Sequence, residues 1–267
     1  MRNIGRYYGA EFAKILANKK NKENIYGVKY KTVKFNGVSG VEVNLDDFNS
    51  VGASSGLYYT FDGENKPTDK LIKALSRAIK LMLPTEYNKV LVLGMGNDSI
   101  VSDTLGTQSV KLLNINKLGE NYAKFCPLVK GKTGLDSYSV IKGITSVFKP
   151  DVVVVVDSLL TTELARLGSS FQLTDAGITP GSAVGNNKCN LTAKTLDCKT
   201  IISIGVPLVV KLDAVVSGVL NKINPQVKTL EDYNKLNLDH IFSPKDIDFL
   251  VEDGATVIAR AIENAFI

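Results

Sequence analysis

The chain of 267 residues contains a single histidine, His240, and three cysteines, Cys126, Cys189 and Cys198. Serine and cysteine hydrolases of the triad type need a histidine beside the nucleophile, and zinc sites usually use more than one. One histidine therefore argues against all three classes. The cysteines are odd in number and show no CxxC spacing, which indicates reduced thiols in a cytosolic compartment.

Long apolar runs and a strong charge of one sign are also missing. No segment has the length of a transmembrane helix, and residues 1–10 lack the apolar core of a signal peptide, so we expect neither export nor a membrane partner. The net charge is +5, from 32 basic and 27 acidic residues spread along the sequence. That surplus does not indicate nucleic-acid binding, although it modestly favours an acidic protein substrate.

Five consecutive valines, residues 152–156, are the clearest structural signal in the chain. They are β-branched and too few for a typical helix, which predicts a central strand buried on both faces of a parallel sheet. Asp157 follows at the carboxyl end, where open α/β sheets bind their ligands. The alternative is that Asp157 or Ser158 caps a helix, which we predict over residues 159–167.

Helices and strands alternate through most of the sequence, which predicts an α/β fold. We expect a mostly parallel or mixed sheet with helices on both faces. The predicted strands cover residues 28–43, with a turn at Asn36-Gly37, and 57–61, 89–94, 151–157, 170–174 and 201–207. The predicted helices cover residues 68–83, 105–113, 134–148, 159–167 and 247–266.

A glycine-containing loop follows the predicted strand 89–94. Gly94-Met95-Gly96-Asn97 lacks the third glycine of a dinucleotide fingerprint, so it is a weak match to one. The loop leads instead to Asp103, whose simpler role would be to cap the next helix. If the strands ending at Gly94 and Asp157 are parallel neighbours, the two aspartates lie along the same edge of the sheet.

Two carboxyl groups a few ångströms apart cannot both ionise easily, so one of them keeps a proton near neutral pH. The ionised group can take a proton from water, while the other donates to a carbonyl oxygen or to the departing amine. Asp103 and Asp157 would together support hydrolysis of a peptide bond without histidine, serine or metal. Which of them holds the proton stays open at this level, because a coupled pair titrates jointly.

Residues 175–186 form a second unusual stretch, rich in glycine and small polar residues. The free backbone N–H groups of such a loop are suited to holding a substrate strand or an oxyanion, and a purely structural turn is the alternative. No lysine stands where a phosphate-binding loop has one. The candidate substrate-binding or supporting residues are Gly96, Asn97, Asp175, Gly177, Pro180, Gly181, Ser182, Gly185 and Asn186.

These stretches together resemble the spore germination protease family, endopeptidases that degrade small acid-soluble spore proteins in endospore-forming bacteria. The resemblance covers roughly residues 54–265, and the glycine-rich loop is its most specific part. The matching segments are residues 90–97, 102–106, 131–137, 149–157, 175–186, 204–207 and 243–253.

The resemblance implies an aspartic-type endopeptidase that uses no cofactor or metal, with its catalytic pair at Asp103 and Asp157. It further implies an α/β fold similar to that of the hydrogenase maturation proteases, a tetramer, synthesis as a zymogen, and a place in the cytoplasm of the spore core. We divide the chain into a variable N-terminal segment, residues 1–55, which is a candidate pro-region with extra strands, and an α/β catalytic domain, residues 56–267.

Several positions depart from the family pattern. Residues 158–162 are Ser-Leu-Leu-Thr-Thr where the family has Ala-Leu-Ala-Ala-Arg, while Thr107 and Ala176 replace a family proline and a family threonine or serine. The altered residues after Asp157 favour one alternative, a catalytically inactive spore protein that uses the fold as a binding module. A metal-dependent maturation-type protease is the other alternative. Glu11-Phe12-Ala13 matches the sequence these proteases cut, so it is either a self-processing site or part of an ordinary helix.

Overall fold

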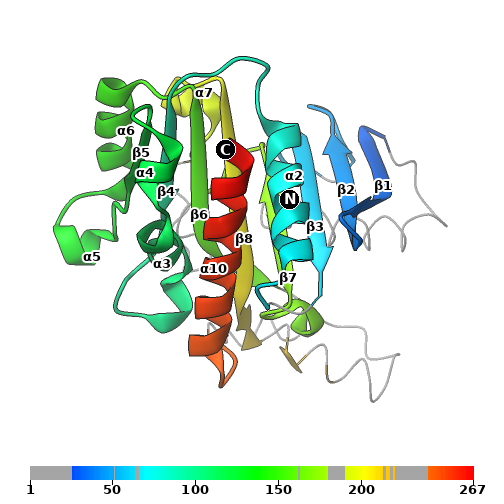
Figure 1. Ribbon diagram of the computed structural model, residues 1–267. Coiled ribbons are helices and arrows are strands. Elements are labelled where there is room, and N and C mark those ends of the chain that lie inside the picture. Colours follow the sequence, from blue (N-terminus) through cyan, green and yellow to red (C-terminus); the bar gives the residue numbers. More distant parts are fainter. Residues whose placement is uncertain are drawn as a thin grey trace.

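The computed structural model describes residues 26–50, 52–63, 66–161, 163–179, 190–212, 215–216, 219 and 240–267. These residues form a mixed sheet in the order β1-β2-β3-β7-β8-β6-β4-β5, with a short strand β9 paired to β8 (Figure 1). The sheet has an antiparallel half and a parallel half, which meet at β8. The α/β fold with a mixed sheet is therefore confirmed.

The antiparallel half consists of β1 (Val28–Phe35), β2 (Val38–Leu45), β3 (Gly56–Asp62) and β7 (Ser170–Thr174). The predicted turn joins β1 to β2, and both of its residues have positive φ, 50° at Asn36 and 87° at Gly37, as a tight hairpin requires. β2 pairs directly with β3. Residues on the two sides of the predicted division at residue 55 thus share one sheet, and the division itself stays a prediction.

The parallel half consists of β5 (Tyr122–Phe125), β4 (Val90–Gly94), β6 (Val152–Thr161) and β8 (Thr200–Lys211), and β9 (Ile241–Phe242) runs antiparallel to β8. β6 lies between β4 and β8, parallel to both. Its five valines are completely buried, which confirms the predicted central strand.

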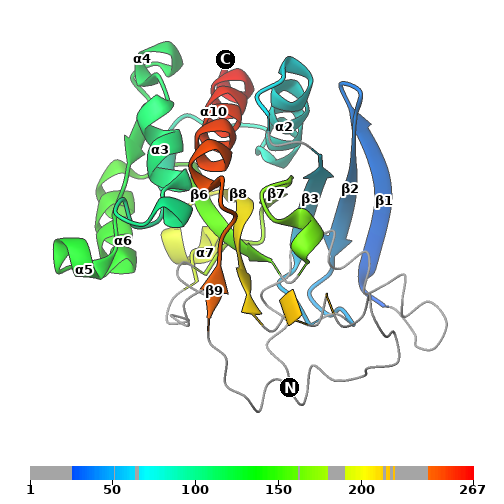
Figure 2. The same ribbon diagram turned by 90° about the horizontal axis from the view of Figure 1, so that it is seen from below.

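Helices cover both faces of the sheet, as predicted. α2 (Asp69–Met82), α3 (Leu105–Leu112) and α10 (Ile247–Phe266) lie on one face, which Figure 2 shows clearly. α6 (Ser137–Phe148) and α7 (Ala193–Leu196) pack on the other face. Alternate valines of β6 serve the two cores: residues 152, 154 and 156 face the first group of helices, and residues 153 and 155 face the second.

The predicted helix over residues 159–167 is wrong. β6 continues through Thr161 because residues 157–161 pair with β8, with an irregularity in register between Leu159 and Leu160. Only a short 3-10 turn, η2 (Leu164–Arg166), follows. Asp157 lies inside a strand, so its alternative role as a helix cap is wrong too.

Short helices connect the larger elements: α4 (Ile115–Leu118), α5 (Lys130–Thr133) and the 3-10 turn η1 (Val101–Asp103). None of the described helices combines the length and the apolarity that crossing a membrane requires.

Candidate active site

Asp157 lies in the middle of the sheet, opposite Gly205 on β8. Strand alternation places its side chain on the same face as Val153 and Val155. The residue is only 8% exposed. The backbone N–H of Ser158 donates to Asp157 Oδ1 at 2.9 Å. This hydrogen bond is modest support for a carboxylate removed from water.

Asp103 ends the turn η1 and is held by the loop that precedes it. Its Oδ2 accepts a hydrogen bond from the backbone N–H of Asn97 at 2.8 Å. The side chain of Asn97 in turn accepts from the N–H of Ser99 at 3.0 Å. Thr104 is the cap residue of α3 and makes no side-chain capping bond. Asp103 is therefore not the helix cap, and Asn97 positions its carboxyl group.

Two glycines, Gly96 in this loop and Gly106 on α3, allow close backbone contacts around Asp103 and the middle of β6. Gly96 has φ +118°, and a Cβ placed there would lie 1.9 Å from the carbonyl oxygen of Asp103. A Cβ at Gly106 would lie 2.4 Å from the carbonyl oxygen of Val156. The N–H of Met95 also donates to that carbonyl oxygen of Val156 at 2.8 Å. Glycine is needed at both positions because a Cβ at Gly96 would clash with Asp103 and a Cβ at Gly106 would clash with Val156 of β6.

The electrostatics couple the two aspartates. Burial, followed by the nearby charge of Asp103, raises the pKa of Asp157 to about 8, against the lowering effect of the Ser158 N–H. Burial also raises the pKa of Asp103, while the hydrogen bond from Asn97 opposes the rise. Because both pKa values are raised and the two groups titrate jointly, the pair holds a proton near neutral pH. The pair can offer one general acid and one general base.

The structure does not bring Asp175 to this pair. Asp175 follows β7, and its Oδ1 accepts from the N–H of Leu57 on β3 at 2.6 Å. β7 is antiparallel to β8 and Gln172 lies opposite Gly205, so Asp175 is three residues further toward the amino ends of the parallel strands. A substrate-binding role for Asp175 stays a prediction.

Gly177 occupies a tight backbone position near Asp175. It has φ +90°, and a Cβ there would lie 2.3 Å from the carbonyl oxygen of Leu191. The other residues predicted for this loop, and the predicted self-processing tripeptide, lie outside the described residues: Pro180, Gly181, Ser182, Gly185, Asn186, Glu11, Phe12 and Ala13.

Lys132 is a residue of the site that sequence reasoning did not assign. Its Nζ lies 3.3 Å from Asp98 Oδ1 and also donates to Ser99 Oγ, so α5 is tied to the loop that holds Asp103. The segment 131–137 was among the family-like stretches, which is the signal that could have identified Lys132.

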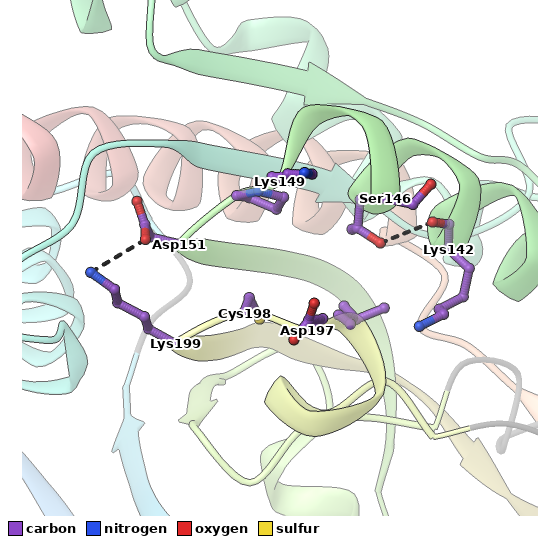
Figure 3. Close-up of a pocket in the computed structure, with 10 residues that line it drawn as sticks. Lys142, Ser146, Lys149, Asp151, Asp197, Cys198 and Lys199 are labelled. Carbon is purple, nitrogen blue, oxygen red and sulfur yellow. Dashed lines mark hydrogen bonds and ion pairs between the residues drawn. The ribbon is translucent and has the colours of Figure 1, made fainter.

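A separate cavity of about 680 Å³ opens at the amino ends of β6 and β8, away from Asp157 (Figure 3). Two of its three lysines are already engaged: Lys199 pairs with Asp151 at 3.3 Å, and Lys142 donates to the carbonyl oxygen of Thr195. The cavity is lined by Lys142, Thr145, Ser146, Lys149, Pro150, Asp151, Leu196, Asp197, Cys198 and Lys199. Within the described ranges no cluster of three or more histidine, cysteine, aspartate or glutamate side chains is arranged to hold a metal ion.

An α/β sheet carrying two coupled carboxyl groups, one buried and one partly buried, defines the class: a protein with an acid–base site of the kind that hydrolases use. A family model described as germination protease matches residues 10–235. The chain therefore belongs to the germination protease family and is a peptidase. This confirms both the family and the enzyme class predicted from the sequence.

Relatives support this assignment over most of the chain. A germination protease of Caldanaerobacter subterraneus subsp. tengcongensis is 28% identical, with 97% of this chain and 90% of the relative covered. Those of Oceanobacillus iheyensis and Clostridium tetani are 32% and 26% identical, covering 76% and 95% of this chain and 62% and 92% of their own.

One solved structure, the [NiFe] hydrogenase maturation protease HycI from Thermococcus kodakarensis, is 16% identical, with 69% of this chain and 98% of that chain covered. Its TM-score is 0.39, too low to bear on the chemistry.

Proposed function

We propose that this peptidase is an aspartic-type endopeptidase that hydrolyses small acid-soluble spore proteins during spore germination. The observation that carries the proposal is the coupling of Asp157 to Asp103, with the pKa of Asp157 raised to about 8 by burial and by the charge of Asp103. Such a pair holds one proton near neutral pH, as acid–base hydrolysis of an amide needs.

In the proposed reaction Asp103 accepts a proton from a water molecule as its oxygen attacks the carbonyl carbon of the peptide bond. Asp157 donates its proton to the carbonyl oxygen, so a neutral tetrahedral intermediate forms. When the C–N bond breaks, Asp103 passes its proton to the departing nitrogen and Asp157 recovers a proton from the intermediate's hydroxyl group. One water is consumed, and both side chains return to their starting states.

The test is cleavage of a purified small acid-soluble spore protein by the wild type and by Asp103→Asn and Asp157→Asn. We expect each substitution to lower kcat by about 10²-fold or more, the range that general acid–base groups contribute. Asp151→Asn is the matched control, because Asp151 lies at the opposite end of β6, where it pairs with Lys199. Wild-type kcat in either pair variant would contradict the mechanism, and activity lost to a chelator and restored by a divalent ion would favour the metal-dependent alternative.

A catalytically inactive binding module is the second candidate, favoured by the departures from the family pattern in residues 158–162. Binding of the spore protein without any cleavage by the wild type would support it. We further propose a homotetramer in the cytoplasm of the spore core, which light scattering and fractionation of spores test.

We also propose self-processing at Glu11-Phe12-Ala13. Intact mass spectrometry after prolonged acid incubation tests it, and a mass unchanged from that of the full chain would contradict it.

A further inference from the structure

The loop that carries Asp103 is closed by hydrogen bonds of its own backbone. The N–H of Asn97 donates to Asp103 Oδ2 at 2.8 Å. Two turns follow: the N–H of Ile100 donates to the carbonyl oxygen of Asn97 at 3.1 Å, and the N–H of Asp103 donates to that of Ile100 at 2.8 Å. Because the donor to the Asp103 carboxyl group is a backbone N–H, its direction depends on the path of the chain between Asn97 and Ile100.

A side chain from another segment contacts that part of the path. Lys132 Nζ lies 3.3 Å from Asp98 Oδ1 and donates to Ser99 Oγ. Asp98 and Ser99 are the two residues between Asn97 and Ile100. Lys132 and Ser99 are 33 residues apart in the sequence, so this contact fixes the turn from outside the loop.

The short helix α5, which carries Lys132, is itself anchored to the body of the protein. Gly134, with φ +76°, ends α5 and turns the chain toward α6. Ser137 at the start of α6 donates to the carbonyl oxygen of Leu128, just before α5, at 2.5 Å. α6 packs on the sheet through the completely buried Ile141. A continuous set of contacts therefore leads from the sheet through α6 and α5 to the Asp103 loop.

The exposure of this contact indicates that its main effect is not on folding stability. The side chains of Lys132 and Asp98 are both 39% exposed. An ion pair in such a position is screened by water and adds little to stability. Catalysis responds more steeply to position, because a misplacement of about 1 Å in a reacting group can cost about 10²-fold in rate.

We propose that Lys132 is a positioning residue of the peptidase site. Through Asp98 and Ser99 it holds the turn from which the Asn97 N–H reaches Asp103, and so keeps that carboxyl group in place beside the peptide bond. Lys132 acts through the loop and not on the reacting atoms. The inference rests on the proposed role of Asp103 in the aspartate pair.

Kinetics with a small acid-soluble spore protein as substrate test this role. Lys132→Met removes the ammonium group and keeps the length of the side chain. We expect kcat to fall about tenfold or more, with KM within about twofold of the wild type and Tm lower by no more than about 3 °C. Lys132→Arg keeps the charge and the donors, so its kcat should stay within about threefold of the wild type.

Lys130→Met is the matched control. Lys130 is an exposed lysine on the same short helix, and its ammonium group makes no ion pair or hydrogen bond within the described residues. Its kcat should equal that of the wild type. A lower Tm with unchanged kcat in Lys132→Met would overturn the proposal, and so would a raised KM with unchanged kcat, which would make Lys132 a substrate-binding residue. Equal losses of kcat in the Met and Arg variants would overturn it too.

Amide hydrogen exchange follows the loop without turnover. The N–H of Asn97 should exchange at least about fivefold faster in Lys132→Met than in the wild type or in Lys130→Met, while the amides of β4 stay unchanged. Unchanged exchange at Asn97 would overturn the positioning role and leave the aspartate pair intact. Full activity in Asp103→Asn would instead refute the pair and this inference with it. Absence of cleavage by the wild type would refute the proposed function together with any role of Lys132 in it.

Discussion

Replacing Asp157 by asparagine should stabilise the protein, and increasingly so as the pH rises. Burial and the charge of Asp103 raise the pKa of Asp157 from 3.8 to about 8. A raised pKa means that the folded state keeps a proton that the unfolded chain has lost, so stability is highest below the unfolded pKa and falls as pH rises through the folded one. At about 1.4 kcal/mol per pKa unit, the full loss is on the order of 6 kcal/mol.

Asparagine does not titrate, so Asp157→Asn escapes this loss. Urea unfolding measures the free-energy difference between the variant and the wild type, which should widen by about 3 kcal/mol between about pH 5 and about pH 7. A difference that stays constant with pH would refute the reasoning. Asp151→Asn should show the opposite trend, because the N–H groups of Asn88 and Lys89 lower the pKa of Asp151. The wild-type Asp151 carboxylate stabilises the fold near neutral pH, and this stabilisation disappears on acidification.

Three further predictions concern the acid role of Asp157, the tight position of Gly96 and the hydrogen bonds of Lys124. The pH profile of kcat/KM should fall above about pH 8 as Asp157 loses its proton, and a plateau continuing well into alkaline pH would count against that residue as the acid. Gly96→Ala should cut activity at least about tenfold and lower Tm by clashing with the Asp103 carbonyl, whereas Gly143→Ala, in an open position on α6, should raise stability by about 0.5–1 kcal/mol. Lys124→Met should cost about 1–2 kcal/mol in urea unfolding, because the Lys124 ammonium donates to carbonyl oxygens at the end of α3 at 2.9 and 2.7 Å; an unchanged midpoint would show that these bonds add nothing.

Local patterns were sufficient for most elements. The apolar stripe between Thr68 and Pro84 predicted α2, whose first turn is capped by the Thr68 side chain. The Asn36-Gly37 turn predicted the β1–β2 hairpin because both residues tolerate positive φ. The same reasoning failed for residues 159–167, where pairing with the long strand β8 keeps the chain extended through Thr161. No local pattern contains that partner strand.

The candidate site divides in the same way. The sequence by itself determined the family, the central valine strand and the two candidate aspartates, because each depends on residues close together in the chain. It placed Asp157 at the carboxyl end of the valine strand, whereas β6 continues past it to Thr161. Only the tertiary structure decided that Asp157 is buried with a raised pKa and that Lys132 contacts the loop that holds Asp103. It also placed Asp175 against β3 instead of beside the pair. Burial, coupling and register arise from contacts between segments tens of residues apart. A local sequence pattern does not include those contacts, so it cannot predict them.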